Sequence, residues 1–176
     1  MELLKGALPH VRRVALLWNP DNRNAQIEAD SAMAVARQIG LTLVPLSLQS
    51  SQDLEPALAR LATEKLDALY AVFSIGPVVD NRTRIVEFGL HQRAPVVSGW
   101  DLMTDAGGLL SYSPNFQWIF NRGAYYVARI LRNAKPSELP VERPMTFELV
   151  VNLKTAKALG LTMPPEIMVQ ATRVIQ

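Results

Sequence analysis

Apolar runs alternate with helical patterns along the first hundred residues of the chain. Each run lacks the alternation of polar side chains that marks a half-exposed strand, so each predicts a strand buried on both faces. Between the runs, apolar side chains recur at helical spacing and predict helices. Four strands are predicted in this part of the chain: residues 14–18, 41–48, 68–73 and 95–98.

This order of elements predicts a mostly parallel sheet covered by helices. Residues 14–18 and 68–73 should be its central strands, because their apolar character is uninterrupted. Pro45 in the second run favours an edge strand or a bend. Asp21 and Asn22 supply candidate caps for the first helix, whose buried face should be the alanine series from residue 25 to residue 36.

The rhythm changes after Trp100. Residues 109–112 predict a strand, and the three prolines between residues 136 and 144 predict an extended connection. Residues 147–151 predict a last strand, followed by a short helix that ends at Gly160. The longest helical pattern lies between these segments and makes one wide apolar stripe: Phe116, Ile119, Phe120, Gly123, Val127, Ile130 and Leu131.

Composition indicates one folded domain with a sizeable core. The chain has 176 residues, of which 49% are hydrophobic and 19% charged, and its mean hydropathy is +0.09. It contains no cysteine, which excludes disulfide scaffolds, cysteine-ligated zinc and thiol catalysis. The net charge of +2 is not gathered in any basic segment, so we expect no nucleic-acid partner.

No apolar run approaches the ~18 residues of a membrane span, so no transmembrane helix is expected. Charged residues from Glu2 to Arg13 interrupt the hydrophobic start and argue against a secretory signal within this chain. On this basis the chain is either cytoplasmic or has lost a signal upstream.

The sequence carries no recognisable catalytic motif. It lacks the glycine-rich phosphate loops, the nucleophile elbow and the H-E-x-x-H zinc motif. His10 and His91 are its only histidines and lie in different structural units, so we interpret both as surface residues. We therefore expect no catalytic residue, no metal site and no cofactor.

Three polar loops follow the predicted parallel strands, at residues 19–22, 74–77 and 98–101. Ligands of open parallel sheets bind beyond the carboxyl ends of the strands, where these loops should converge. Taken singly, each loop is also explained as a turn or helix cap, and Trp100 as a core residue. Their convergence on one edge favours a binding site.

Several stretches resemble a known family. They are MELLKGALPHVRRVALLWNPDN at residues 1–22, GGLLSYSPN at 107–115, ILRNAKP at 130–136 and FELVVNLKTAKALGL at 147–161. Together they resemble the substrate-binding components of ABC importers, in the family that includes tryptophan-type and other aromatic amino-acid-binding proteins and is related to leucine/isoleucine/valine-binding proteins. The segment NLKTAKALGL is the most specific of these pieces.

The resemblance implies a type I periplasmic-binding fold, in which two α/β lobes joined by three crossovers close on a small solute. The fold class expected here is therefore α/β, a three-layer parallel sheet flanked by helices, forming one lobe. Residues 1–105 would be the second lobe of the family, 106–140 a return segment of the first lobe, and 141–176 the final return. The chain would then be the C-terminal portion of a periplasmic protein, either a cloned fragment or a truncated product.

The resemblance also implies binding residues. Asn19 and Asp21 fall in the family's N-P-D/G-N loop, and Tyr112 lies in its G-G-L-x-S-Y segment. Ser74 begins a loop in which relatives often carry a proline-aspartate pair that this chain lacks, so the solute is not identified. Trp100 lies in the third crossover region. We expect Asn19, Asp21, Ser74, Trp100 and Tyr112 to line the cleft.

Three classes of function remain open at this stage. The resemblance favours a solute-binding component that works with ABC permease subunits and is not an enzyme. A ligand-sensing effector domain of the same fold is a second candidate, although the sequence has no basic segment for reading DNA. A nucleotide-using α/β enzyme would need a phosphate loop that is absent.

The apolar stripe from Phe116 to Leu131 predicts an association surface. In relatives it would pack on the sheet of the first lobe, so here it should be buried in a two-fold homodimer. The alternative is that the helix folds back on its own lobe and the chain stays monomeric.

Overall fold

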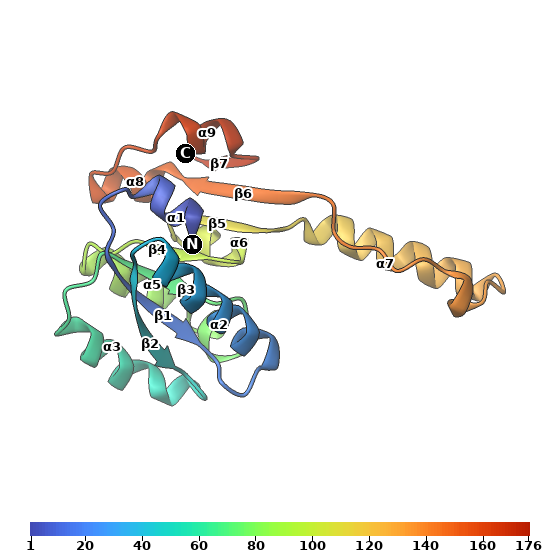
Figure 1. The fold of residues 1–176 in the computed structure, drawn as a ribbon, viewed down its shortest axis with the longest axis horizontal. Helices are drawn as coiled ribbons and strands as arrows, with labels where there is room; N and C mark the ends of the chain where they lie inside the picture. The colour runs from blue at the N-terminus through green and yellow to red at the C-terminus, as the bar shows by residue number, and fades with distance from the viewer.

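The computed structural model describes residues 1–176 as a seven-stranded sheet in the order β2-β1-β3-β4-β5-β6-β7 (Figure 1). Neighbouring strands are parallel except β5 and β6, which are antiparallel. This confirms the predicted α/β fold with a mostly parallel sheet. The strands are β1 (Arg13–Trp18), β2 (Thr42–Ser47), β3 (Ala68–Ala71), β4 (Val96–Ser98), β5 (Leu110–Pro114), β6 (Phe147–Asn152) and β7 (Arg173–Ile175).

Helices cover both faces of this sheet. One apolar cluster packs under α3, α4 and α5, and two others pack under α1, α2 and α9. The helices are α1 (Glu2–Ala7), α2 (Arg23–Gln38), α3 (Leu54–Ala62), α4 (Pro77–Asp80), α5 (Arg82–His91), α6 (Asp101–Asp105), α7 (Phe116–Leu131), α8 (Leu153–Leu159) and α9 (Pro165–Gln170), with short 3-10 turns at Ser51–Asp53 and Pro136–Glu138.

The two predicted central strands are indeed internal. β1 lies between β2 and β3, and β3 lies between β1 and β4. Along β1, Leu17 joins the cluster under α3 while Leu16 joins the cluster under α2, and both side chains are fully buried. Because a residue and its neighbour point to opposite faces, burial of both requires helices on each side. Pro45 lies in β2, which is one of the two edge strands.

Helix α2 packs closely because its buried face consists of small side chains. The buried residues are the four alanines that the periodicity predicts, from Ala25 to Ala36. Asn22 is the N-cap, since its Oδ1 accepts hydrogen bonds from the backbone N–H groups of Asn24 and Ala25. Asp21 does not cap the helix, because its carboxylate contacts Gln49 instead.

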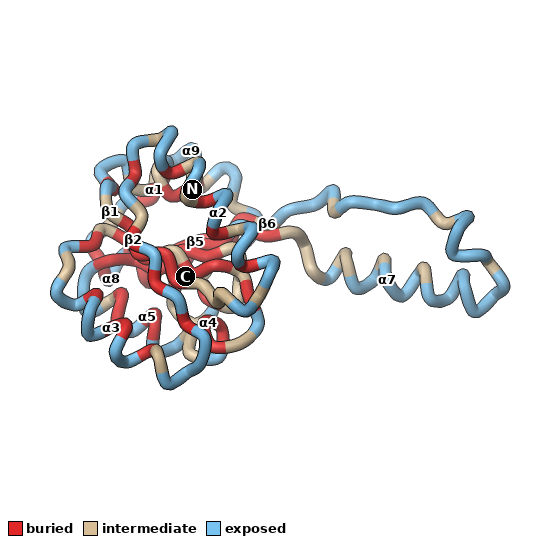
Figure 2. Tube along the Cα trace, turned by 60° about the horizontal axis from the view of Figure 1, so that its bottom comes forward, coloured by how far each residue is buried: buried red, intermediate tan, exposed pale blue.

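The chain leaves the lobe between β5 and β6 as an arm, which we define as residues 115–146. Figures 1 and 2 show α7 projecting away from the sheet with the returning segment beside it. No residue of α7 is buried. The returning segment is held by an ion pair between Arg122 and Glu142 and by a hydrogen bond from the Tyr126 hydroxyl to the Pro140 carbonyl oxygen. The helix therefore does not fold back on its own lobe.

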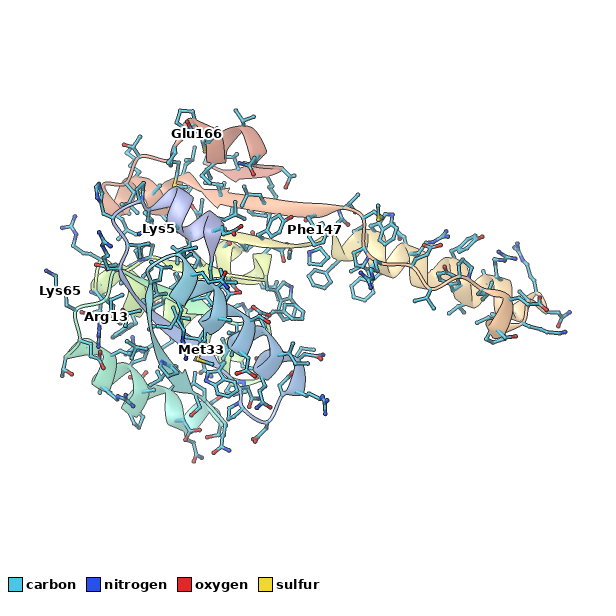
Figure 3. All side chains as sticks on the ribbon, in the orientation of Figure 1. Lys5, Arg13, Met33, Lys65, Phe147 and Glu166 are labelled. Carbon is cyan, nitrogen blue, oxygen red and sulfur yellow. The ribbon has the colours of Figure 1, made fainter.

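The division at residues 106 and 140 between two lobes stays a prediction, but the strand pairing defines where the arm begins and ends. Residues 110–114 stay in the sheet as β5, paired with β4 and with β6. At the other end, the sheet resumes at Phe147, which Figure 3 shows where the arm meets the lobe. The strand pairing therefore places the junction at Pro114 and Phe147, whose Cα atoms are partners.

One predicted element is wrong. The strand over residues 147–151 is not the last, because β7 follows and pairs in parallel with β6. Only three residues form β7, too few to show an apolar pattern. Helices α1, α6 and α9 were not predicted either, since five or six residues are too short for a helical period to recur.

Candidate functional site

The carboxyl ends of β1, β3, β4 and β5 lie at one edge of the sheet, because these strands are mutually parallel. We call this the carboxyl edge. The arm leaves the lobe from the same edge, through Asn115 after β5. Asn115 fixes the start of α7 in two ways: its Oδ1 accepts a hydrogen bond from the Trp118 N–H, and its Nδ2 donates to the Glu148 carboxylate at 2.6 Å.

Three aromatic rings meet at the carboxyl edge, and we call them the aromatic cluster: Phe73, Trp100 and Phe116. Phe73 follows β3, Trp100 follows β4, and Phe116 is the first residue of α7. The rings of Phe73 and Phe116 are stacked, with centroids 5.5 Å apart and planes at 11°. The Trp100 ring lies 4.6 Å from Phe73 and 6.0 Å from Phe116. All three residues are half-buried, so they still present apolar ring surface to a ligand.

Two cavities share Phe73 and Phe116. The first, which we call the Glu28 cavity, has a volume of about 340 Å³ and is lined by Glu28, Tyr70, Phe73, Gly99, Tyr112, Pro114 and Phe116. The second, the Trp100 cavity, has about 540 Å³ and is lined by Phe73, Ile75, Trp100, Asp101, Leu102, Phe116, Gln117, Phe120 and Glu148. Both are of the size that small-molecule ligands occupy, ~300–1,000 Å³.

Acidic groups give these cavities their charge. The Glu28 carboxylate accepts a hydrogen bond from the Tyr70 hydroxyl at 2.6 Å. Burial of the Tyr70 phenol, together with the neighbouring Glu28 charge, raises the pKa of Tyr70, so the hydroxyl stays protonated and keeps donating. In the Trp100 cavity, Asp101 lies 3.4 Å from the Arg173 guanidinium, which also bonds Asp105 at 2.7 Å. The hydrogen bond to Asp105 is the main cause that raises the pKa of Arg173.

Two of the residues predicted from the sequence line these cavities. Trp100 lies in the aromatic cluster, and its indole forms part of the wall of the Trp100 cavity. Tyr112 lines the Glu28 cavity and stacks on Phe147, with ring centroids 5.4 Å apart. Almost half of Tyr112 is exposed, at 47%.

The other three predicted residues lie beside the cavities rather than in their walls. Asn19 uses its Oδ1 to accept the Asp21 N–H at 3.0 Å, which closes the turn after β1. The Asp21 carboxylate turns toward Gln49, at 3.4 Å from its Nε2. Ser74 is buried after β3, and its hydroxyl has no hydrogen-bond partner in the chain. These residues belong to the carboxyl edge, but none of them is among the residues that line the Glu28 cavity or the Trp100 cavity.

Sequence reasoning missed Glu28, Phe73 and Phe116 as residues of the site. Glu28 could have been noticed, because it falls between Ala25 and Ala32 on the otherwise alanine-lined face of α2. A carboxylate at such a position needs a specific partner. Phe116 was interpreted only as part of the apolar stripe, and Phe73 only as the end of a strand.

Other kinds of site find little support among the side chains. His10 and His91 are both exposed, as predicted, and no group of three or more His, Asp or Glu side chains is placed to hold a metal ion. None of the helices combines the length and the hydrophobicity that crossing a membrane requires.

Comparison with known proteins identifies the family to which the chain is similar. The sequence profile described as "ABC transporter substrate binding protein" matches residues 1–175. A tyrosine-binding protein of Clostridioides difficile is 20% identical over 161 residues, which are 92% of this chain and 46% of that protein.

Two crystal structures have the same fold. A conserved domain protein from Vibrio cholerae is 28% identical and has a TM-score of 0.87, with 98% of this chain and 58% of that chain covered. An ABC domain from Streptococcus pneumoniae, solved in complex with L-Trp, is 23% identical and has a TM-score of 0.86, with 99% and 60% covered. The chain thus spans about half to three-fifths of the length of these relatives.

The match over residues 1–175 agrees with the resemblance carried by the N-terminal, GGLLSYSPN and NLKTAKALGL segments. The sheet and its flanking helices agree with the fold of the solved relatives. The chain belongs to the ABC transporter substrate-binding protein family.

Proposed function

We propose that this chain forms the solute-binding lobe of an ABC importer component and holds an aromatic amino acid, or a similar amine, without chemical change. The observation that carries the proposal is the aromatic cluster. Two ligand-sized cavities, the Glu28 cavity and the Trp100 cavity, are both lined by Phe73 and Phe116 of this cluster. Stacked, half-exposed rings provide a surface on which another aromatic ring can stack. The relatives that bind tyrosine and L-Trp support an aromatic solute.

The five residues predicted from the sequence would contact the solute in different ways. Trp100 and Tyr112 would contact the solute through their rings, since both line the cavities. Asn19 and Asp21 would act from the loop after β1, and Ser74 through its unpaired hydroxyl, once the site closes. An unpaired buried hydroxyl gains most when a ligand supplies its missing partner.

The arm would belong to a second lobe that completes an interlobe cleft. It leaves from the carboxyl edge, exposes an apolar face, and returns to the sheet at Phe147. The relatives are longer than this chain, so their additional residues can supply such a lobe. The complete protein would then act outside the cytoplasmic membrane and deliver its solute to ABC permease subunits.

In the 176-residue chain itself, we propose that a second copy covers the exposed face of α7. Phe120, Val127 and Leu131 are 71%, 57% and 79% exposed. Contiguous apolar patches on a helix mark an interface more often than a free surface. A two-fold arrangement would bury the same face on both copies.

Ligand-observed NMR with the twenty amino acids, presented in small mixtures, tests the binding proposal. Aromatic amino acids should show saturation transfer from the protein, with dissociation constants weaker than micromolar, because one lobe supplies about half of the contacts. Trp100→Ala should weaken the effect, whereas His91→Ala, an exposed residue away from the site, should not. Saturation transfer to aliphatic or acidic amino acids only would contradict the proposal.

A further inference from the structure

We propose that Glu28 binds a positively charged amino group of the solute, so that this lobe selects amines and disfavours carboxylates. The inference rests on the proposed function and names the chemistry that the site recognises. Glu28 is carried by α2, on the helix face that packs against the sheet, and its carboxylate reaches the carboxyl edge beside Tyr70 and Phe73.

The carboxylate of Glu28 is held in one orientation before any ligand arrives. Its Oε1 accepts two hydrogen bonds, from the Tyr70 hydroxyl at 2.6 Å and from the Phe73 N–H at 3.3 Å. Gly99 leaves room for it, because a Cβ at that position would lie 3.2 Å from the same oxygen. Such fixed acceptors bind better than mobile ones, since little freedom is lost when the ligand docks.

The second oxygen of this carboxylate has no hydrogen-bond partner within the chain. Both Tyr70 and the Phe73 N–H donate to Oε1, which leaves Oε2 free to accept from a ligand. Glu28 is half-buried and lines the Glu28 cavity. If Glu28 served only to hold Tyr70, one oxygen would be enough and the other would need no access to a cavity.

The walls of the Glu28 cavity suit a cation. Tyr70, Phe73, Tyr112 and Phe116 surround the carboxylate with aromatic rings. The face of an aromatic ring attracts an ammonium group, and the attraction grows where water is partly excluded. A ligand with an amino group near an aromatic ring could place its amino group at Glu28 and its ring against Phe73 and Phe116.

One positive group is coupled to Glu28: the α-amino group of Met1, whose pKa is lowered by burial although the Glu28 charge acts in the opposite direction, so it is a weak counter-ion. The chain has 18 lysines and arginines, yet none of them lines the Glu28 cavity or the Trp100 cavity. Asp101 and Glu148 line the Trp100 cavity, but the Arg173 guanidinium lies 3.4 Å from Asp101 and offsets its charge, so the preference for amines rests on Glu28. A carboxylate-bearing ligand would be repelled by Glu28, and no lysine or arginine lines the Glu28 cavity to bind it.

Two matched ligands separate amine recognition from ring recognition. 2-Phenylethylamine and 3-phenylpropionate have the same ring and the same spacer but opposite charges at neutral pH. We would titrate each, and L-phenylalanine, into the ¹⁵N-labelled chain and follow its amide signals up to about 20 mM ligand. The amine should bind at least about tenfold more tightly than the acid and should shift the signals of Phe73 and Gly99.

The variants are chosen to change one property at a time. Glu28→Gln keeps the size of the side chain and an acceptor for Tyr70. It should weaken binding of 2-phenylethylamine about tenfold and leave binding of 3-phenylpropionate nearly unchanged. Tyr70→Phe keeps the carboxylate and should retain the preference for the amine. Asp30→Asn removes an exposed charge from the same helix and serves as the matched control.

Equal binding of amine and acid by the unmodified chain would overturn the inference without any variant. An equal loss of affinity for the amine and the acid in Glu28→Gln would also overturn the inference, because Glu28 would then have a structural role only. In either case, binding of L-phenylalanine would leave the proposed function standing. Absence of binding by all three ligands would overturn both.

Discussion

Replacement of Phe120 by aspartate should separate two copies of the chain. Phe120 lies on the exposed face of α7, in the first half of the apolar stripe, and is 71% exposed. Val127, Ile130 and Leu131 continue this face, at 57%, 43% and 79% exposure. At its centre, a Cβ added to Gly123 would meet no heavy atom within 4 Å, so the helix backbone is open to close approach there.

The size of the effect follows from these exposed fractions. Phe120, Val127, Ile130 and Leu131 together expose about two and a half whole side chains. At about 1.5–3 kcal/mol for each side chain buried, covering them would contribute about 4–7 kcal/mol per copy and about twice that per dimer. Association costs about 4–15 kcal/mol. A micromolar dissociation constant needs about 8 kcal/mol net, so this burial gives one only where the association cost is near the lower end of that range. Loss of Phe120 from both copies removes about 2–4 kcal/mol, equivalent to about 30- to 700-fold in the dissociation constant.

Sedimentation equilibrium over about a hundredfold range of concentration measures this constant directly. The unmodified chain should approach twice its 19.5 kDa mass at the highest concentration, and Phe120→Asp should remain near 19.5 kDa throughout. Val169→Asp introduces the same charge at an apolar residue of α9 that is 86% exposed, and should dimerise as the unmodified chain does. The reasoning fails if the unmodified chain is monomeric at every concentration, or if the two variants behave alike.

Two further predictions concern the arm and the packing of the lobe. The hydrogen bonds from Arg122 lower the pKa of Glu142 to about 2 from its ordinary value of 4.5. The contribution of Glu142 to holding the returning segment is therefore complete above 4.5 and is lost as the pH falls through about 2. A ¹³C carboxyl titration that placed the midpoint of Glu142 near 4.5 would show that the contact does not persist in solution. Gly89→Ala should lower the free energy of unfolding in urea by about 1–3 kcal/mol, because the added Cβ would lie 2.7 Å from a backbone carbonyl oxygen. Gly123→Ala is the control: its Cβ would meet no atom within 4 Å, so it should not destabilise the chain. Equal effects of the two substitutions would contradict the close packing of α5 at Gly89.

The central part of the fold was predictable because its signals are local. An uninterrupted apolar run can be satisfied only between two helical layers, and β1 and β3 lie there with fully buried side chains such as Leu16 and Leu69. β7 gave no such signal, because it is three residues long and none of them is fully buried. Its pairing with β6 depends on long-range geometry rather than on its own pattern.

The site was predictable only in part, for a similar reason. Strand topology alone places Trp100 at the carboxyl edge, since that residue follows β4. The role of Glu28 depends on a contact with Tyr70, which is 42 residues away in the sequence, and no local pattern encodes it. Periodicity also established the apolar stripe of α7, but a helical repeat does not specify which surface covers it.

The three tryptophans of the chain allow the most direct test of the proposed site. Trp100 lines the Trp100 cavity, whereas Trp18 and Trp118 line neither that cavity nor the Glu28 cavity. The ¹H–¹⁵N spectrum of the labelled chain should show one indole N–H signal from each, assignable with single Trp→Phe variants. On titration with unlabelled L-tryptophan, the Trp100 signal should move progressively and by more than the other two. A spectrum in which Trp100 stays fixed, or in which only Trp18 or Trp118 moves, would contradict binding at the aromatic cluster.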